Sequence, residues 1–239
     1  MSAVQSDRVV DRDALKRAAA EAAVKLVEND MIVGLGSGST AAFALEHLAE
    51  RIAGGLRVAG IPTSEATAAL ARRLGIPLTD FDRNPRIDLT IDGADQVERG
   101  TLHLIKGLGG ALLREKIIAA ASARLIIAVD ESKLVDRLGG RTPLPVEIVR
   151  FGWQTTLDRL AALGCAPQLR RAGGAPVTTD GGNLIADCAL AEISDPAALE
   201  ARLSSIVGVV ETGLFIGMAA AAVIGHAAGV EIVRRARIV

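Results

Sequence analysis

Aromatic residues are almost missing from this 239-residue sequence, which has no tyrosine, one tryptophan and four phenylalanines. Proteins that bind single-stranded nucleic acids stack successive bases on aromatic side chains. An excess of one charge is missing as well, because 27 Lys and Arg residues stand against 28 Asp and Glu residues. Nucleic-acid-binding surfaces need a basic excess. We therefore expect no nucleic-acid partner, although a single phosphate group could bind locally.

Cysteine and histidine are scarce too. Cys165 and Cys188 form neither a CxxC pair nor a disulfide framework, which is typical of a reducing compartment. The three histidines, His47, His103 and His226, are scattered rather than grouped at the spacing of metal ligands. The sequence predicts no metal site and no cofactor, and we expect a cytoplasmic protein.

Long uncharged runs are few. Residues 1–13 contain no apolar segment of the kind that signal peptides carry. The run 214–230 is almost uncharged, but glycines and His226 interrupt it, which makes it a poor membrane-spanning candidate. We expect no membrane contact, and we expect this run to form a buried strand followed by a packed helix or loop.

What is present is an alternation of apolar runs and helical patterns. The pattern predicts helices at 14–27, 41–52, 63–74 and 112–121, and strands at 31–33, 56–61, 76–78, 87–91 and 125–129. Strands that alternate with helices favour an α/β fold with a doubly wound, mostly parallel, Rossmann-like sheet.

The order changes after Pro143. The predicted elements are a strand at 144–149, a helix at 152–163, strands at 167–171 and 183–190, a helix from Asp195 and a strand at 207–215. The order β-α-β-β-α-β is the ferredoxin-like pattern. We therefore predict a Rossmann-like catalytic domain of residues 1–142 plus 218–239, and a smaller ferredoxin-like α+β domain of residues 143–217.

A glycine-rich turn, GLGSGST at 34–40, connects a predicted strand to a predicted helix. It lacks the last glycine of a dinucleotide fingerprint, where Ser39 stands, and it lacks the lysine of a Walker loop. Backbone N–H groups, the hydroxyls of Ser37, Ser39 and Thr40, and a helix N-terminus favour an oxyanion. A tight turn with serine caps is the alternative.

Acidic residues and glycines gather in the segment 92–116, directly after the predicted strand 87–91. Asp92 and Asp95 flank Gly93 at a strand end, which is where α/β proteins build sites. Neighbouring carboxylates raise the pKa of one of them, which suits proton transfer. An Asx-turn is the alternative for this pair.

A second glycine loop follows Lys106 and precedes the helix that carries Glu115. A lysine there can stabilise an oxyanion, and glycines let the backbone approach a ligand. Glu115 is a candidate general base, with a solvated helix-face glutamate as the alternative. These groups favour proton transfer on a phosphorylated small molecule, and an enediol isomerisation fits.

Six motifs in order resemble the ribose-5-phosphate isomerase type A family along essentially the whole chain: GLGSGST (34–40), TSEAT (63–67), DGAD (92–95), LLREK (112–116), AVDESK (128–133) and PLPVEI (143–148). The resemblance implies a cofactor-free interconversion of D-ribose 5-phosphate and D-ribulose 5-phosphate in the non-oxidative pentose phosphate pathway. It also implies a homodimer or homotetramer.

The resemblance assigns roles to single residues. Glu115 matches the base that carries a proton between C1 and C2 through a cis-enediolate, and Asp92 matches an acid that assists ring opening. Asp95 and Lys106 match groups that hold the sugar oxygens, and Lys16 is a further candidate for the phosphate. The implied substrate-binding residues are Ser37, Gly38, Ser39, Thr40, Asp92, Gly93, Ala94, Asp95, Lys106, Gly107, Leu108, Gly109 and Lys133.

The sequence departs from the family pattern at Ser37, Gln96 and Leu108, where the family often has threonine, glutamate and glycine. A Cβ at position 108 disfavours a positive φ in the glycine loop. The main alternative function is a sugar-phosphate sensor on a related fold, which would need a helix-turn-helix segment and no base. The first predicted helix begins at Ala14 and Glu115 is present, so we expect the enzyme. An amino-sugar-phosphate deaminase-isomerase or a CoA transferase on a similar fold is a second alternative.

Overall fold

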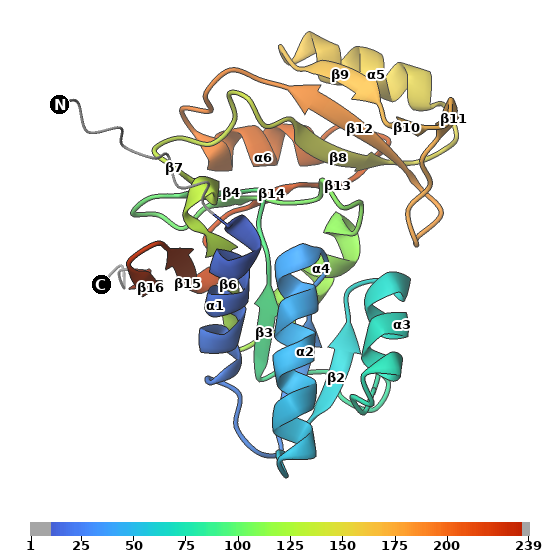
Figure 1. Ribbon diagram of the computed structural model, residues 1–239. Helices are drawn as coiled ribbons and strands as arrows, with labels where there is room; N and C mark the ends of the chain where they lie inside the picture. The colour runs from blue at the N-terminus through green and yellow to red at the C-terminus, as the bar shows by residue number, and fades with distance from the viewer. Residues whose placement is uncertain (1–10, 236–239) are drawn as a thin grey trace, which may run out of the picture.

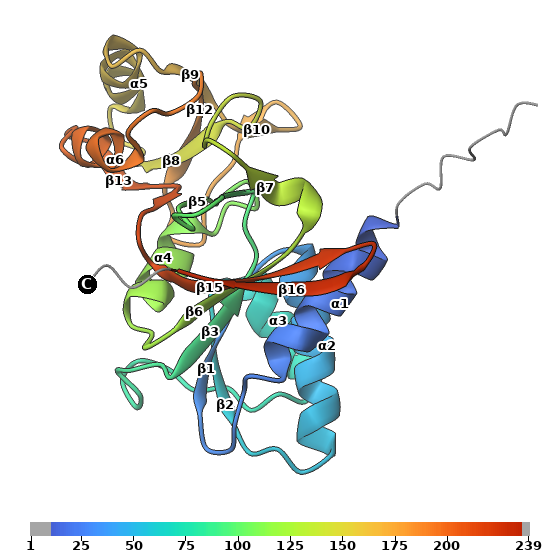
Figure 2. The same ribbon diagram turned by 90° about the vertical axis from the view of Figure 1, so that its left-hand side faces the viewer.

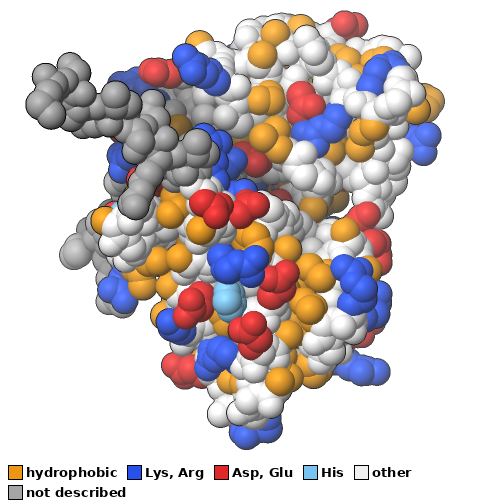
Figure 3. Space-filling view, in the orientation of Figure 1, with side chains coloured by type: hydrophobic (Ala, Val, Ile, Leu, Met, Phe, Trp, Pro, Cys, Tyr) orange, Lys and Arg blue, Asp and Glu red, His pale blue; other side chains and the backbone are white. Residues whose placement is uncertain are grey.

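A computed structural model describes residues 11–235, so the two ends of the predicted first domain (1–10 and 236–239) lie outside the described residues. Two sheet-based layers are stacked along the long axis of the molecule, with a small sheet between them (Figure 1). Acidic and basic side chains are interspersed over the face seen in that view, and neither gathers into a patch (Figure 3). None of the helices within 11–235 has both the length and the apolar character needed to cross a bilayer.

The larger layer is built on a six-stranded sheet with the order β16-β15-β6-β3-β1-β2. Its strands are β1 (Ile32–Leu35), β2 (Ala59–Pro62), β3 (Leu89–Asp92), β6 (Leu125–Asp130), β15 (Ala219–His226) and β16 (Gly229–Arg234). All pairings are parallel except that of β15 with β16.

Four helices cover the two faces of this sheet: α1 (Arg12–Val24), α2 (Ser39–Ala53), α3 (Glu65–Arg73) and α4 (Leu112–Ala120). Figure 2 shows α4 on one side of the sheet and α1, α2 and α3 on the opposite side. Asp11 caps α1 and Ser64 caps α3 through side-chain oxygens that accept backbone N–H groups. The predicted doubly wound, mostly parallel sheet is confirmed.

The smaller layer is an antiparallel sheet with the order β13-β8-β12-β9. Its elements are β8 (Leu144–Ile148), α5 (Trp153–Ala162), β9 (Ala166–Leu169), β12 (Leu184–Ala189), α6 (Pro196–Ser204) and β13 (Val209–Thr212), with a short hairpin of β10 (Arg171–Ala172) and β11 (Ala175–Pro176) after β9. Asp195 caps α6, with Pro196 at its start. The order is that of the predicted ferredoxin-like pattern.

A small sheet with the order β14-β5-β4-β7 lies between the two layers and has no counterpart in the sequence prediction. Its strands are β4 (Gln96–Glu98), β5 (Leu104–Ile105), β7 (Leu134–Val135) and β14 (Leu214–Phe215), and a 3₁₀ turn, η1 (Glu131–Lys133), precedes β7. Strands of two or three residues are too short to show a period. Because β14 belongs to one predicted domain and its partners to the other, the domain boundaries stay a prediction.

The prediction that the run 214–230 ends in a packed helix or loop is wrong. The alanine-rich segment Ala219–His226 is strand β15, which pairs with β6 on one side and β16 on the other. Alanine favours a helix locally, but two neighbouring strands satisfy this backbone, and the small side chains let α1 pack closely. Gly225 is the closest approach, since a Cβ built there would lie 2.0 Å from the Leu15 carbonyl oxygen.

Two further strand predictions need correction. The predicted strand 76–78 is reduced to a single bridge between Leu78 and Gly60. The predicted strand 207–215 is divided into β13 and β14 at Gly213, where a Cβ would lie 2.3 Å from the Lys106 carbonyl oxygen. This close approach brings the end of the smaller layer against the residue that precedes the second glycine loop.

The close approach of β15 to α1 predicts that Gly225→Ala lowers the free energy of unfolding by about 1–3 kcal/mol, because the backbone of α1 must move. Gly181→Ala is the matched control, since its Cβ would lie 3.5 Å from the nearest heavy atom, Glu147 Oε1. Urea denaturation of both variants measures the difference. Equal stabilities for the two variants would show that β15 and α1 are less tightly packed than described.

Candidate active site

The site lies at the carboxyl ends of β1 and β3, which are neighbours in the parallel sheet. Residues after β1 therefore contact residues after β3. Gly36 donates its N–H to the Ile91 carbonyl at 3.0 Å. A Cβ at Gly36 would lie 2.3 Å from Asp92 Oδ1, so only glycine lets the two loops meet this closely.

A cavity of about 510 Å³ opens between these loops and the smaller layer. Most predicted site residues line it: Lys16, Ser37, Gly38, Ser39, Thr40, Gly93, Ala94, Asp95, Lys106, Gly107, Gly109, Glu115 and Lys133. Two predicted residues do not line it. Asp92 is buried behind the wall in contact with Lys106, and the side chain of Leu108 is 42% exposed beside the loop. Within 11–235, no group of three His, Cys, Asp or Glu side chains is arranged as metal ligands.

Three buried charged side chains meet at the base of the cavity. Lys106 Nζ lies 3.1 Å from Asp92 Oδ2 and 3.3 Å from Glu115 Oε1. The same Nζ donates to the Gly93 carbonyl at 2.6 Å. Asp92 Oδ1 accepts the N–H groups of Ser37 and Gly93, at 3.1 and 2.8 Å. The exposed fractions of the three side chains are only 3%, 1% and 7%, so water screens these charges little.

The pKa values of the three groups follow from burial and mutual contact. Burial and, after it, the neighbouring Asp92 carboxylate together raise the pKa of Glu115 to about 8, although Lys106 acts against both. Burial also raises the pKa of Asp92, although Lys106 and two backbone N–H groups oppose it. Burial lowers the pKa of Lys106, but the two carboxylates outweigh burial and leave that pKa raised. Lys106 therefore stays charged, and the raised pKa of Glu115 lets this carboxyl group exchange a proton near neutral pH.

Glu115 differs from Asp92 in how completely its oxygens are bonded. It lies in the first turn of α4, and its Oε2 is buried without a hydrogen-bond partner among the described residues. An unbonded buried carboxylate oxygen is costly, so it rarely occurs without a functional reason. A carboxyl group with a raised pKa and a free oxygen in a cavity can remove a proton from a bound molecule.

The second glycine loop accommodates Leu108 without strain. Positive φ angles in this loop occur at Gly107 (105°) and Gly110 (86°), and Leu108 is not among the residues with positive φ. Leu108 therefore does not require the backbone conformation that a Cβ disfavours. The Leu108 N–H donates to Asp95 Oδ2 at 2.9 Å, which fixes the carboxylate on the cavity wall.

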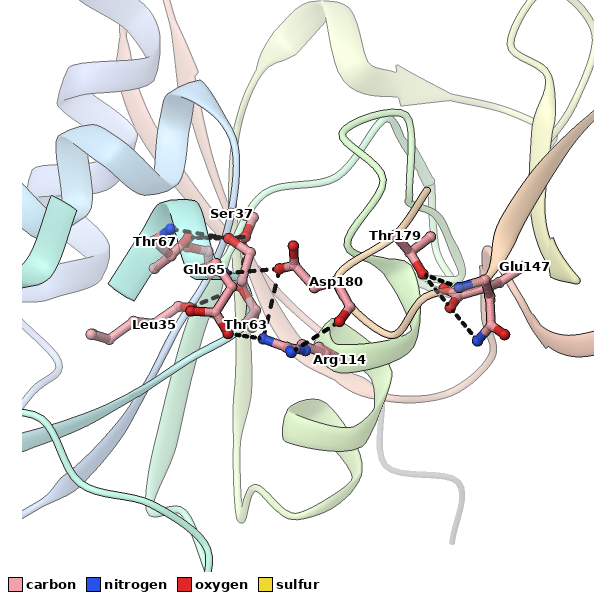
Figure 4. A network of polar contacts seen from close by, with 12 residues as sticks. Leu35, Ser37, Thr63, Glu65, Thr67, Arg114, Glu147, Thr179 and Asp180 are labelled. Carbon is pink, nitrogen blue, oxygen red and sulfur yellow. Dashed lines mark hydrogen bonds and ion pairs between the residues drawn. The ribbon is translucent and has the colours of Figure 1, made fainter. Parts of the chain in front are cut away.

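The hydroxyl of Ser37 lies in a cluster that is bonded within the protein. Ser37 Oγ lies 2.8 Å from both Thr63 Oγ1 and Ser64 Oγ and 3.0 Å from Thr67 Oγ1. Thr63 and Thr67 donate in turn to the carbonyls of Leu35 and Gly36, at 3.0 Å each. Figure 4 shows this cluster beside the end of β1. The hydroxyl protons are thus directed into the protein rather than toward an anion.

Backbone groups remain as the main donors of the first loop. Gly38, at φ 92°, precedes α2, and no side chain caps the first N–H groups of that helix. Uncapped N–H groups at a helix N-terminus favour a bound anion. Lys16 and Lys133 add positive charge to the cavity wall, and Lys16 Nζ also pairs with Asp13 Oδ1 at 2.9 Å.

The sequence prediction missed the turn that closes the cavity from the smaller layer. Val177, Thr178, Thr179 and Asp180 line the cavity there. Asp180 Oδ2 accepts the Glu65 N–H at 2.8 Å, and Arg114 Nη1 pairs with Glu65 Oε1 at 2.9 Å (Figure 4). Four glycines between 173 and 182 are typical of a connection between strands, but nothing in the local sequence indicates that this connection folds back across the cavity.

At the base of this turn, buried Glu147 accepts from Thr179 Oγ1 and Asn183 Nδ2, at 2.8 and 2.9 Å. The turn is therefore held from two sides, by Glu147 of β8 and by α3 and α4, whose Glu65 N–H and Arg114 side chain both contact Asp180.

Comparison with known proteins gives one family. The model of "Ribose 5-phosphate isomerase A (phosphoriboisomerase A)" matches residues 59–229. A ribose-5-phosphate isomerase A from Gloeobacter violaceus is 57% identical over 223 residues, which covers 93% of this chain and 97% of that relative. One from a Synechococcus species is 56% identical over 225 residues, covering 93% and 98%.

Solved structures agree with the sequence comparison. A D-ribose-5-phosphate isomerase in complex with phospho-erythronic acid superposes with a TM-score of 0.91 at 37% identity, covering 95% of this chain and all of that one. The ribose 5-phosphate isomerase A of Methanocaldococcus jannaschii gives 0.89 at 39% identity, covering 93% and 99%. The chain is therefore an isomerase and belongs to the ribose 5-phosphate isomerase A family.

Proposed function

We propose that this isomerase interconverts D-ribose 5-phosphate and D-ribulose 5-phosphate through an enediolate, with Glu115 as the base. The observation that carries the proposal is the Glu115 carboxyl group itself. It lines the cavity, has a pKa raised to about 8 and keeps one oxygen free, while its other oxygen lies 3.3 Å from Lys106 Nζ. A carboxylate with this pKa is a stronger base than an exposed one and is still partly ionised near neutral pH.

The proton transfer follows from these positions. Glu115 removes the C2 proton of the open-chain aldose, the C–H electron pair forms the C1–C2 double bond, and O1 takes up negative charge. The proton of O2 then passes to O1, which leaves the negative charge on O2. As C2–O2 becomes a carbonyl, the electron pair of the C1–C2 double bond takes the proton back from Glu115 at C1, which gives the ketose. Lys106 stabilises the oxyanion from a buried position, where a charge is weakly screened.

The remaining residues bind and position the sugar phosphate. The backbone N–H groups of Gly38, Ser39 and Thr40, together with Lys16 and Lys133, hold the phosphate. Asp95, on the cavity wall, accepts a hydrogen bond from a sugar hydroxyl. Asp92 assists ring opening through Lys106, because it contacts Lys106 Nζ and does not itself line the cavity.

A sensor function is not favoured. Relatives named as isomerases match this chain over nearly their full length, at identities of 48–57%. A domain that only binds a sugar phosphate has no use for a buried carboxyl group with a free oxygen, which costs folding free energy.

Replacing the base tests the proposal directly. We expect Glu115→Gln to lower kcat for ribose 5-phosphate by about 10²–10⁴-fold, because the amide cannot accept the proton. Glu21→Gln is the matched control, because the Glu21 side chain on α1 is exposed, and this variant should retain full activity. Circular dichroism confirms folding of both. Turnover by Glu115→Gln close to that of the wild type would refute the role of Glu115.

The raised pKa predicts the pH dependence. Only ionised Glu115 can accept a proton, so kcat/KM should rise with pH and level off above the Glu115 pKa of about 8. Initial rates measured in buffers of constant ionic strength give the profile. A profile that is already level at pH values well below 8, after correction for the second ionisation of the sugar phosphate, would contradict the raised pKa.

We further propose that the protein is a homodimer or homotetramer. Phe151 and Val207 expose 95% and 77% of their surfaces, which is apolar area that an interface between copies would cover. Sedimentation velocity should give a mass above that of one chain, and Phe151→Ser should shift it downward. A single-chain mass for the wild type at all concentrations would contradict this.

Two wider expectations accompany the activity. We propose that the protein acts in the non-oxidative pentose phosphate pathway and in the cytoplasm, in keeping with its free cysteines Cys165 and Cys188. Interrupting its coding sequence should block growth that depends on interconversion of pentose phosphates. Unimpaired growth without a second isomerase would argue against the pathway.

A further inference from the structure

A partly buried ion pair of the smaller layer lies directly behind the second glycine loop. Arg170 follows β9, and its Nε donates to Asp187 Oδ2 on β12 at 2.8 Å, while Nη2 contacts Asp187 Oδ1. The two side chains are 15% and 24% exposed, and neither lines the cavity. The ion pair therefore has no direct access to a bound sugar.

The free end of Arg170 reaches the loop backbone. Its Nη1 donates to the carbonyls of Gly107 and Leu108, at 3.1 and 2.9 Å. The carbonyl of Gly107 and the N–H of Leu108 belong to one planar peptide unit. That N–H donates to Asp95 Oδ2 at 2.9 Å. One peptide is thus held by Arg170 on its oxygen side and by Asp95 on its nitrogen side.

We propose that Arg170 is a positioning residue of the isomerase, which acts through the 107–108 peptide to orient Asp95 toward the sugar. The inference rests on the proposed function, since it gives Asp95 a task in binding the substrate. Asp187 has the supporting role of holding the guanidinium group of Arg170 in place.

The chemistry of the groups explains why this peptide needs holding. Gly107 has a φ of 105°, so glycine's freedom would allow the peptide that follows it to rotate. Rotation would direct the Gly107 carbonyl oxygen, instead of the Leu108 N–H, toward the Asp95 carboxylate. Arg170 opposes this, because a cation on the carbonyl oxygen favours one orientation and polarises the N–H toward Asp95.

Arginine suits this task better than lysine. Its planar guanidinium can bind the Asp187 carboxylate along one edge and still present Nη1 to the two carbonyls. A lysine ammonium is a single point of charge at the end of a flexible chain and cannot fix both partners in one plane.

The experiment compares Arg170→Ala and Arg170→Lys with Arg171→Ala in the full-length protein. Arg171 is the matched control, because it is the adjacent arginine, it is exposed, and its Nη1 donates to the Gly174 carbonyl of the β10–β11 hairpin at 2.8 Å. We expect both Arg170 variants to lower kcat/KM by up to about 10²-fold, mainly through KM. Arg171→Ala should keep the wild-type value. Guanidinium ions, added below denaturing concentrations, should partly restore the kcat/KM of Arg170→Ala and should not raise that of the other variants.

A double-mutant cycle tests the route of the effect. If Arg170 acts through Asp95, Arg170→Ala should have little further effect on kcat/KM in an Asp95→Ala background. Multiplicative losses from the two substitutions would overturn the proposal, as would equal activities of Arg170→Ala and Arg171→Ala.

Amide hydrogen exchange gives a readout that does not depend on activity. The Leu108 N–H should exchange faster in Arg170→Ala and in Asp187→Asn than in Arg171→Ala, and equal exchange in all three would overturn the proposal. An inactive wild-type protein would instead refute the proposed function, and the exchange result would still decide whether Arg170 holds the peptide.

Discussion

The contact between Lys106 and two buried carboxylates is the interaction on which the site depends. Without Lys106, burying either carboxylate in its charged form would cost too much free energy, so the group would move to the surface or become protonated. Lys106 compensates for the charge of Asp92 and leaves Glu115 balanced between its two protonation states. Gly36 permits the close approach that buries Asp92, and β5 delivers Lys106 to it. This contact between Lys106 and the two carboxylates is therefore positioned by three parts of the fold: the first glycine loop, β3 and the small middle sheet.

The smaller layer takes part in the site without carrying its central charges. The turn at Val177–Asp180 forms one wall of the cavity, and Arg170 contacts the loop that follows Lys106. Gly213, at the junction of β13 and β14, touches the carbonyl of Lys106 itself. Packing in the ferredoxin-like layer is thereby transmitted to the geometry at the base of the cavity.

Much of this could be predicted from sequence because the relevant signals are local. Glycine loops between strand and helix, and acids at strand ends, indicated the position of the cavity and of Glu115. The features that the sequence did not predict depend on contacts between residues far apart in the chain. Ala219–His226 has the composition of a helix and becomes a strand only because β6 and β16 bond to its backbone. Arg170 looks like any polar residue near a hairpin, and the loop carbonyls that it contacts, those of Gly107 and Leu108, are 63 and 62 residues away along the chain. The inward direction of the Ser37 hydroxyl could not be predicted either, because it depends on contacts with Thr63 and Thr67, which are distant in the sequence.

The raised pKa of Glu115 also acts on folding. In the unfolded chain this carboxyl group has its ordinary pKa of 4.5, whereas in the folded protein the pKa is about 8. The folded state therefore binds this proton more tightly, and the contribution of Glu115 to stability declines as the pH rises from the first value to the second. The ionised form, which we propose accepts the substrate's proton, is the form that the fold tolerates least. The enzyme thus trades conformational stability for basicity at a single side chain.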